Sequence, residues 1–173
     1  MGLRKVEVTS FNKSWSSMFE QEANKLYKIF GSEIIKIHHI GSTSVIGLKA
    51  KPIIDIMLVV KNINQVDGFT TAMTTIGYES KGENGISGRR FFQKGGDNRT
   101  HHVHIFELGN VEIEHHLAFR NYLRSHPDTA KAYGELKEAL SQRFPYDIEA
   151  YIHGKEQLVS EIKNRAIDWY EDI

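Results

Sequence analysis

The chain has 173 residues, with 22 Lys and Arg balanced by 22 Asp and Glu, and 40% of its residues are hydrophobic. This length and composition are typical of one globular domain with a core. A net charge of zero argues against bulk nucleic-acid binding, which normally needs a basic balance. The absence of cysteine excludes disulfides and thiolate metal sites.

No targeting or membrane-spanning segment is evident in the sequence. No apolar run approaches the roughly 18 residues that a spanning helix needs, and the first residues, MGLRKVEVTS, lack the apolar core of a signal peptide. We therefore expect a water-soluble, cytoplasmic protein with no membrane partner.

The first part of the chain predicts a helix followed by two strands. Apolar residues recur at helical spacing over residues 14–30; Ser17 and Glu20 resemble a capping box, and Gly31 is placed to end the helix. Residues 33–40 predict a strand that ends at Gly41. Residues 52–60 predict a second strand, apolar on both faces except at Asp55, which is typical of a buried strand in an α/β sheet.

The middle of the chain predicts one helix and two more strands. The helix covers residues 64–76, and the strands cover 89–94 and 100–108. The glycine-rich piece 82–88 predicts a mobile loop or hairpin connection, and residues 94–98 predict a turn.

From Val111 onward the pattern is helical. One helix ends near His126, Pro127 suits the first turn of the next, and a last helix runs from Asp147 to about Tyr170. We expect a single domain over residues 1–173, with an α/β half at 1–109 and a helical half at 110–173.

The turn after the first strand has the features of an anion site. Gly41 lets a ligand approach the main chain, and backbone N–H groups with the hydroxyls of Ser42, Thr43 and Ser44 could hold a phosphate. Asp55, among isoleucines, would be costly unless a cation or several donors satisfied it. Alternatively, Ser42 caps a helix and Asp55 pairs with Lys51 at the wet end of its strand.

These residues carry a resemblance to a known family. The stretch GSTSVIGLKAKPIIDIMLVV is similar to the signature of the GrpB-like family, a branch of the nucleotidyltransferase-fold superfamily. The likeness extends over nearly the whole chain, through FNKSWSSMFEQEANKL, GRRFFQK, RTHHVHIFE, HLAFRNYLRSHP, YGELKEAL and YIHGKEQLV. It implies a bacterial protein with a small mixed sheet flanked by helices and followed by a C-terminal helical part.

The superfamily also implies a metal motif, from which this chain departs. In that superfamily a Gly-Ser turn grips a triphosphate, and carboxylates spaced as D-x-D bind divalent metal on the next strand. Gly41 and Ser42 match the turn and Asp55 matches the first carboxylate, but the second position is Met57. A thioether is a poor ligand for magnesium, which weakens the case for nucleotidyl transfer by two metal ions.

Two histidines offer a different site. His102 and His104 alternate, so both point to one face of their strand, and with Asp55 they would suit zinc, manganese or iron better than magnesium. Alternatively, the histidines contact phosphate, or His104 acts as a general base. They could also be a polar sheet face that is hydrogen-bonded to backbone and to Glu107.

Basic residues are the remaining candidates for phosphate contacts. Arg89 and Arg90 follow the glycine-rich loop and could close over an anion, and Lys51 lies near Asp55 in sequence. The resemblance implies that the helical part brings lysines to nucleotide phosphates, which points to Lys137 and Lys155. A solvated surface position is the alternative for each.

We therefore expect a protein that binds a nucleotide or other phosphorylated small molecule in a cleft. Metal-dependent nucleotidyl transfer, with Asp55 and His104 catalytic and Mg, Mn or Zn as cofactor, is the accompanying hypothesis. One alternative is an inactive binding module linked to coenzyme A metabolism, since a similar domain is fused to dephospho-coenzyme A kinase in some bacteria. Another is metal-dependent phosphoester hydrolysis.

Overall fold

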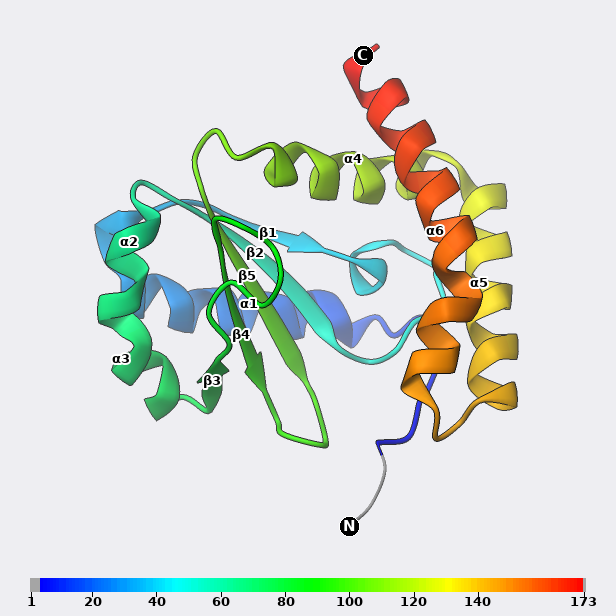
Figure 1. The fold of residues 1–173 in the computed structure, drawn as a ribbon, viewed down its shortest axis with the longest axis horizontal. Helices are drawn as coiled ribbons and strands as arrows, with labels where there is room; N and C mark the ends of the chain where they lie inside the picture. The colour runs from blue at the N-terminus through cyan, green and yellow to red at the C-terminus, as the bar shows by residue number, and fades with distance from the viewer. Residues whose placement is uncertain (1–3, 173) are drawn as a thin grey trace.

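The computed structural model describes residues 4–172 and is built around one mixed five-stranded sheet (Figure 1). The strands lie in the order β1-β2-β5-β4-β3; β2 and β5 run parallel and the other neighbours run antiparallel. The bounds are Ile34–Ile40 for β1, Ile54–Val60 for β2, Tyr78–Ser80 for β3, Arg89–Lys94 for β4 and His101–Glu107 for β5. The predicted small mixed sheet is confirmed, and β3 is an addition to it.

One face of the sheet is covered by α1, which spans Ser14–Phe30. Its apolar stripe, including the buried Trp15 and Leu26, packs on alternate residues of β2 in the main core. The predicted bounds of this helix are confirmed, but the capping box is wrong. The helix already begins at Ser14, whose N–H donates to Asn12 Oδ1 at 2.8 Å, and this puts Ser17 inside the first turns.

The continuous helix predicted over residues 64–76 is interrupted. The chain forms α2 at Ile63–Val66, a 3₁₀ turn at Asp67–Phe69 and α3 at Thr70–Thr75. Gly68 and the run of threonines have low helix propensity, and both the N–H and the hydroxyl of Thr70 donate to the Asp67 carbonyl. Local backbone bonding therefore divides a segment whose apolar spacing alone predicts one helix.

Three helices follow the sheet, as predicted. They are α4 at Val111–Ser125, α5 at Pro127–Arg143 and α6 at Ile148–Glu171. Asn110 and Asp147 cap α4 and α6 through their side-chain oxygens. Figure 1 shows α4 running above the strands toward α5 and α6, which lie side by side at one end of the sheet.

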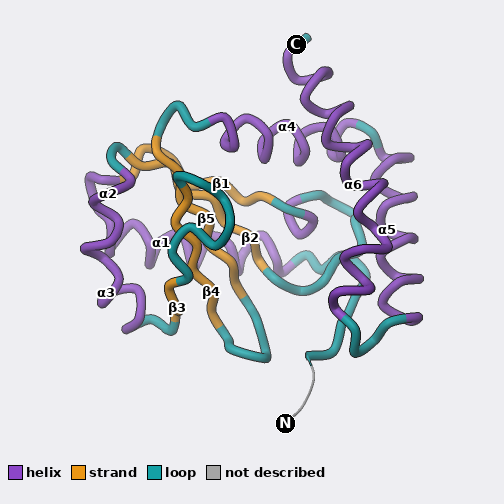
Figure 2. The backbone as a smooth tube through the Cα atoms, viewed as in Figure 1, coloured by secondary structure: helices purple, strands orange, loops and turns teal. Residues whose placement is uncertain are grey.

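The connection between β1 and β2 links the sheet to these helices. Figure 2 shows it leaving β1 toward α5 and α6 before it returns to β2. Its first residues form a short 3₁₀ turn, η2, at Ser42–Ser44. Arg124 of α4 donates twice to the Ser44 carbonyl, at 3.0 and 2.8 Å, and Arg120 donates to the His39 carbonyl at 3.1 Å. Helix α4 thereby holds the turn in place.

Among residues 4–172, no helix is long and apolar enough to cross a membrane.

Candidate functional site

Strand register brings the predicted site residues together. Ile40 of β1 pairs with Asp55 of β2, so the turn at Gly41 begins directly beside that aspartate. Asp55 in turn pairs with His102 of the parallel strand β5. Because side chains alternate along a strand, Asp55, His102 and His104 all face the helices α4 to α6.

A cavity of about 360 Å³ lies between this sheet face, the turn after β1 and the three C-terminal helices. Nine of the ten predicted site residues line it: Gly41, Ser42, Thr43, Lys51, Asp55, His102, His104, Lys137 and Lys155. Residues from both halves of the chain thus share one concave site, the usual form of a small-molecule pocket.

Asp55 is held by the two histidines. His104 Nε2 lies 3.1 Å and His102 Nδ1 lies 3.4 Å from the same carboxylate oxygen, Oδ1. Burial raises the pKa of Asp55, but hydrogen bonds from His102 and His104 outweigh it and hold the pKa well below its usual range. The alternative pairing with Lys51 is not found among the ion pairs of the described residues.

The turn after β1 is ordered by its own hydroxyl groups. Ser44 donates to the Gly41 carbonyl through both its N–H and its hydroxyl. Thr43 Oγ1 lies 2.9 Å from His39 Nε2, whose ring stacks on Phe19 at 4.8 Å. Ser42 does not cap the turn; its hydroxyl points at the cavity and accepts a hydrogen bond from Lys137 at 2.8 Å.

Three of the four lysines that line the cavity, Lys51, Lys137 and Lys155, lie beside aromatic rings. Lys137 of α5 lies over the ring of Tyr133 at 4.4 Å, and Lys51 and Lys155 lie near the ring of Tyr151 at 5.5 and 5.7 Å. None of the three belongs to an ion pair within residues 4–172. The aromatic rings favour the cations, yet each ammonium group keeps donors free for an anion.

Burial and mutual repulsion change the acidity of these lysines. Burial first, and then the charges of Lys155 and Lys51, lower the pKa of Lys137 to about 7. Burial, followed by Lys155, lowers the pKa of Lys51 to about 8, and burial lowers the pKa of Lys155. Grouped cations with lowered pKa values are an electrostatic arrangement that an incoming polyanion relieves.

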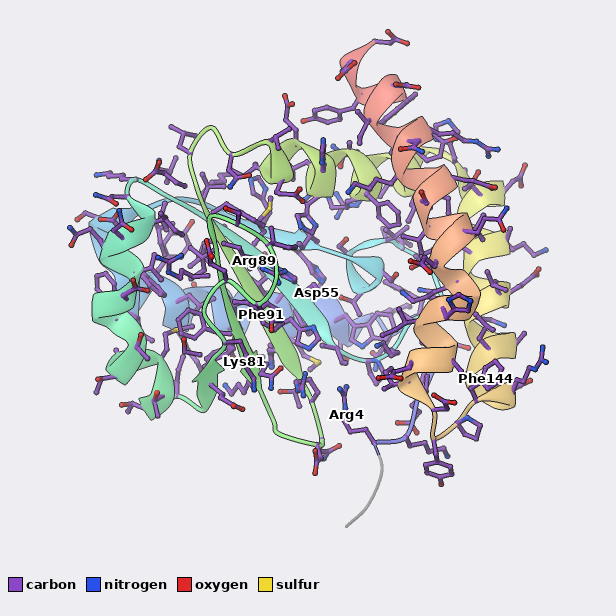
Figure 3. The ribbon with its side chains drawn as sticks, viewed as in Figure 1. Arg4, Asp55, Lys81, Arg89, Phe91 and Phe144 are labelled. Atoms are coloured by element: carbon purple, nitrogen blue, oxygen red, sulfur yellow. The ribbon has the colours of Figure 1, made fainter. Side chains whose placement is uncertain are left out.

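The anion contact predicted for Arg90 is not supported by its position. Arg90 lies outside the cavity, where its Nε donates to Asp67 Oδ1 at 2.8 Å beside α2. Its neighbour Arg89 turns the other way because successive side chains in a strand face opposite sides. Figure 3 labels Arg89 beside Phe91, and its guanidinium is 4.8 Å from the Phe91 ring.

Sequence reasoning missed the contribution of α4. Glu112, His115, His116 and Phe119 line the cavity, and their spacing places them on one face of a helix, which is the signal that could have found them. Among the described residues, His116 Nε2 is buried without a hydrogen-bond partner. Burial, followed by the charge of His104, lowers the pKa of His116 to about 4, so its ring is neutral near pH 7.

The donor set does not suit a divalent cation as the side chains stand. Met57, where the resemblance implied a second metal ligand, is fully buried with Ile40 and Phe106 and is covered by Ile113 and Leu117 of α4. Within residues 4–172 no three His, Asp or Glu side chains are spaced to hold a metal ion. Metal binding by Asp55, His102 and His104 remains a prediction that this geometry does not favour.

Two further likenesses are distant. Dephospho-CoA kinase of Mycolicibacterium paratuberculosis is 24% identical over 90% of this chain and 44% of that protein. A crystal structure of the Cid1 poly(U) polymerase aligns with a TM-score of 0.46 and 12% identity, over 78% of this chain and 45% of that one. The second likeness concerns the fold alone, and neither carries an activity to this chain.

Close relatives establish the family. The protein YqkA of Bacillus subtilis is 50% identical over 96% of this chain, which spans about half of YqkA (48%). The crystal structure of conserved protein GrpB from Enterococcus faecalis has a TM-score of 0.92 and 45% identity, over 95% of this chain and 99% of that one. Residues 5–165 match the family described as GrpB protein. The chain therefore belongs to the GrpB family.

Proposed function

We propose that the cavity binds a nucleotide or another phosphorylated small molecule. The observation that carries this proposal is the convergence of Lys51, Lys137 and Lys155 on one side of a concave site, none of them in an ion pair within residues 4–172. The ammonium groups of buried Lys137 and partly buried Lys51 and Lys155 repel one another, and a polyphosphate would replace that repulsion with charge-assisted hydrogen bonds.

The turn after β1 adds a second set of phosphate contacts. Ser42 already shares a hydrogen bond with Lys137, so one phosphate can take donors from the hydroxyl, the ammonium and the backbone at the glycine. The rest of the ligand would lie against the other wall, which Phe119, His115 and His116 make aromatic. A flat base or another partly apolar group fits such a wall.

Titration calorimetry with nucleoside triphosphates, inorganic triphosphate and dephospho-coenzyme A, each in EDTA, tests the proposal. We expect at least one of them to bind, and Lys137→Met and Lys155→Met each to weaken binding about tenfold or more, because each removes a charge-assisted hydrogen bond of about 1.5–3 kcal/mol. Lys131→Met is the matched control, since Lys131 is exposed on the same helix α5. Equal affinities in all three variants would refute the proposal.

Nucleotidyl transfer is the second candidate, favoured by one observation. The Asp55 carboxylate, hydrogen-bonded by His104, stands at the turn proposed to hold phosphate. Incubating labelled nucleotides with candidate acceptors, and comparing the parent protein with Asp55→Asn, separates transfer from binding. Transfer that disappears in Asp55→Asn while nucleotide affinity is kept would support it, and binding without turnover in the parent would favour a binding module. We also propose that the protein is located in the cytoplasm.

A further inference from the structure

Arg89 contacts the far side of the His104 ring. Its Nη1 lies 3.3 Å from His104 Nδ1, while its Nε and Nη2 donate to the carbonyls of Glu83 and Asn84 at 3.2 and 2.9 Å. A guanidinium group has only donors, so Nδ1 must be the acceptor and cannot carry the proton. The ring proton of neutral His104 therefore sits on Nε2, which faces Asp55 Oδ1 at 3.1 Å.

Arg99 makes the corresponding contact to His102. Its Nη1 lies 3.1 Å from His102 Nε2, and its Nε donates to the Gly96 carbonyl at 3.0 Å in the turn between β4 and β5. By the same argument His102 Nε2 is the acceptor, and the proton sits on Nδ1, 3.4 Å from Asp55 Oδ1. The two histidines therefore carry their protons on opposite ring nitrogens, each directed at one carboxylate oxygen.

We propose that Arg89 and Arg99 are positioning residues that hold His104 and His102 as N–H donors to Asp55, and that this arrangement takes the place of a divalent cation beside the carboxylate. A metal-bound histidine almost always donates its other N–H to an acceptor. Here the other nitrogen faces a cation that accepts nothing. A metal on either ring would set an N–H against a guanidinium N–H and add positive charge beside Arg89 or Arg99.

The inference deepens the proposed function, because it makes phosphate binding at this site independent of metal. The lysines would then supply the positive charge that metal ions supply in the nucleotidyltransferase superfamily. The two proposals can fail separately, since the ring protons are properties of the protein without ligand. A protein that bound no phosphate could still show the inferred tautomers.

Nitrogen NMR of the histidine rings in the ligand-free protein tests the inference. His102→Gln and His104→Gln assign the signals. We expect His104 to be protonated at Nε2 and His102 at Nδ1, with neither ring shifting when equimolar Zn²⁺ is added. The opposite tautomer at either ring, or a Zn²⁺ shift at these two rings, would overturn the inference.

Exchanging each arginine for glutamine supplies the acceptor that the guanidinium lacks. We expect Arg89→Gln and Arg99→Gln to let the facing histidine take up the other tautomer, and the double variant to bind Zn²⁺ about tenfold more tightly than the parent. Arg90→Gln is the matched control, because it removes the same charge from the adjacent residue, which pairs with Asp67. Tautomers unchanged in both single variants would show that the arginines do not set them. If Arg89→Gln does not fold because Arg89 is buried, the tautomer of His102 in Arg99→Gln tests the inference by itself.

Discussion

A Cβ atom at residue 41 would lie 2.7 Å from Asp55 Oδ2, so the aspartate occupies the space that any side chain there would need. Gly41 also has φ 72° and ψ −173°, a backbone region that is essentially restricted to glycine. The position of the carboxylate therefore depends on the glycine. Asp55 can lie this close to the turn only because residue 41 has no side chain.

Gly41→Ala should therefore cost more than a backbone penalty. We expect a loss of about 1–3 kcal/mol of unfolding free energy from the strained angles, with further loss from the contact with Asp55. Gly47→Ala is the control, because Gly47 also has a positive φ of 83° but has nothing within 4 Å of the added Cβ. Urea unfolding of both variants measures the difference, and equal losses would contradict the contact.

Lys137 should make stability and ligand binding depend on pH in opposite directions. Its pKa of about 7 lies below the ordinary 10.5, so the folded state binds fewer protons than the unfolded state between these values. The free energy of unfolding from this group therefore rises from about pH 7 toward pH 10. Triphosphate favours the protonated lysine, so its stabilising effect should be largest at pH 6–7 and decrease by pH 9.

Melting temperatures from pH 6 to pH 9, with and without triphosphate, measure both effects. Lys51, with a pKa of about 8, contributes a similar slope, so Lys137→Met should reduce the slope without abolishing it. The variant should also be more stable than the parent at pH 6 without ligand, because it no longer buries a charge. A parent whose ligand-induced shift grew toward pH 9 would contradict this assignment.

Glu22 should control stability in acid. It is 3% exposed and accepts from Tyr78 OH at 2.8 Å and Lys94 Nζ at 2.9 Å. Burial raises its pKa, but the hydrogen bonds from Lys94 and Tyr78 outweigh this and lower it below 4.5. The stabilisation is therefore fully present above pH 4.5 and is lost as the pH falls through the lower, folded value.

We expect Glu22→Gln to lose about 1.5–3 kcal/mol at pH 7, the usual value of hydrogen bonds to a charged group, and to unfold with a shallower dependence on pH below 4.5. Glu20→Gln, at an exposed position of the same helix, is the control. Circular dichroism during acid titration measures both. Identical acid transitions in the parent and Glu22→Gln would exclude the buried carboxylate as the cause.

Arg124 should affect the site without lining the cavity proposed for the ligand. Its two hydrogen bonds to the Ser44 carbonyl fasten the turn after β1 to α4. Arg124→Gln should cost about 1–3 kcal/mol of stability. It should also weaken triphosphate binding, because the ligand would then have to order the turn as it binds, and this cost reduces the free energy of binding. Arg165→Gln, exposed on α6, is the control. Unchanged affinity for triphosphate in Arg124→Gln would show that the turn after β1 does not need Arg124 to keep its conformation.

The sequence predicts those helices, strands and site residues whose positions follow from the pattern of their near neighbours in the chain. The long amphipathic stripe of α1 and the alternation of His102 and His104 are properties of a few neighbouring residues. The side that Arg90 faces is different, because it depends on strand register and on Asp67, 23 residues away. The division of the predicted helix at Gly68 likewise reflects local backbone bonding that apolar spacing does not reveal.

Residue spacing did not reveal which side chains contact the two histidines. Arg89 and Arg99 lie 15 and 3 residues from the histidines they contact, and only the hairpin between β4 and β5 brings Arg89 to His104. Met57 shows the converse, since its departure from the metal motif is visible in sequence. Its burial under Ile113 and Leu117 gives the structural setting.

The cavity draws Asp55, His102 and His104 from β2 and β5, and the lysines Lys137 and Lys155 from α5 and α6. The lysines proposed to hold an anion and the carboxylate thus lie on separate stretches of chain. If the proposed function holds, substitutions in the last two helices would change how strongly an anion binds while the carboxylate side stays intact, and the reverse would also hold. A site divided in this way can change its ligand without rebuilding its sheet.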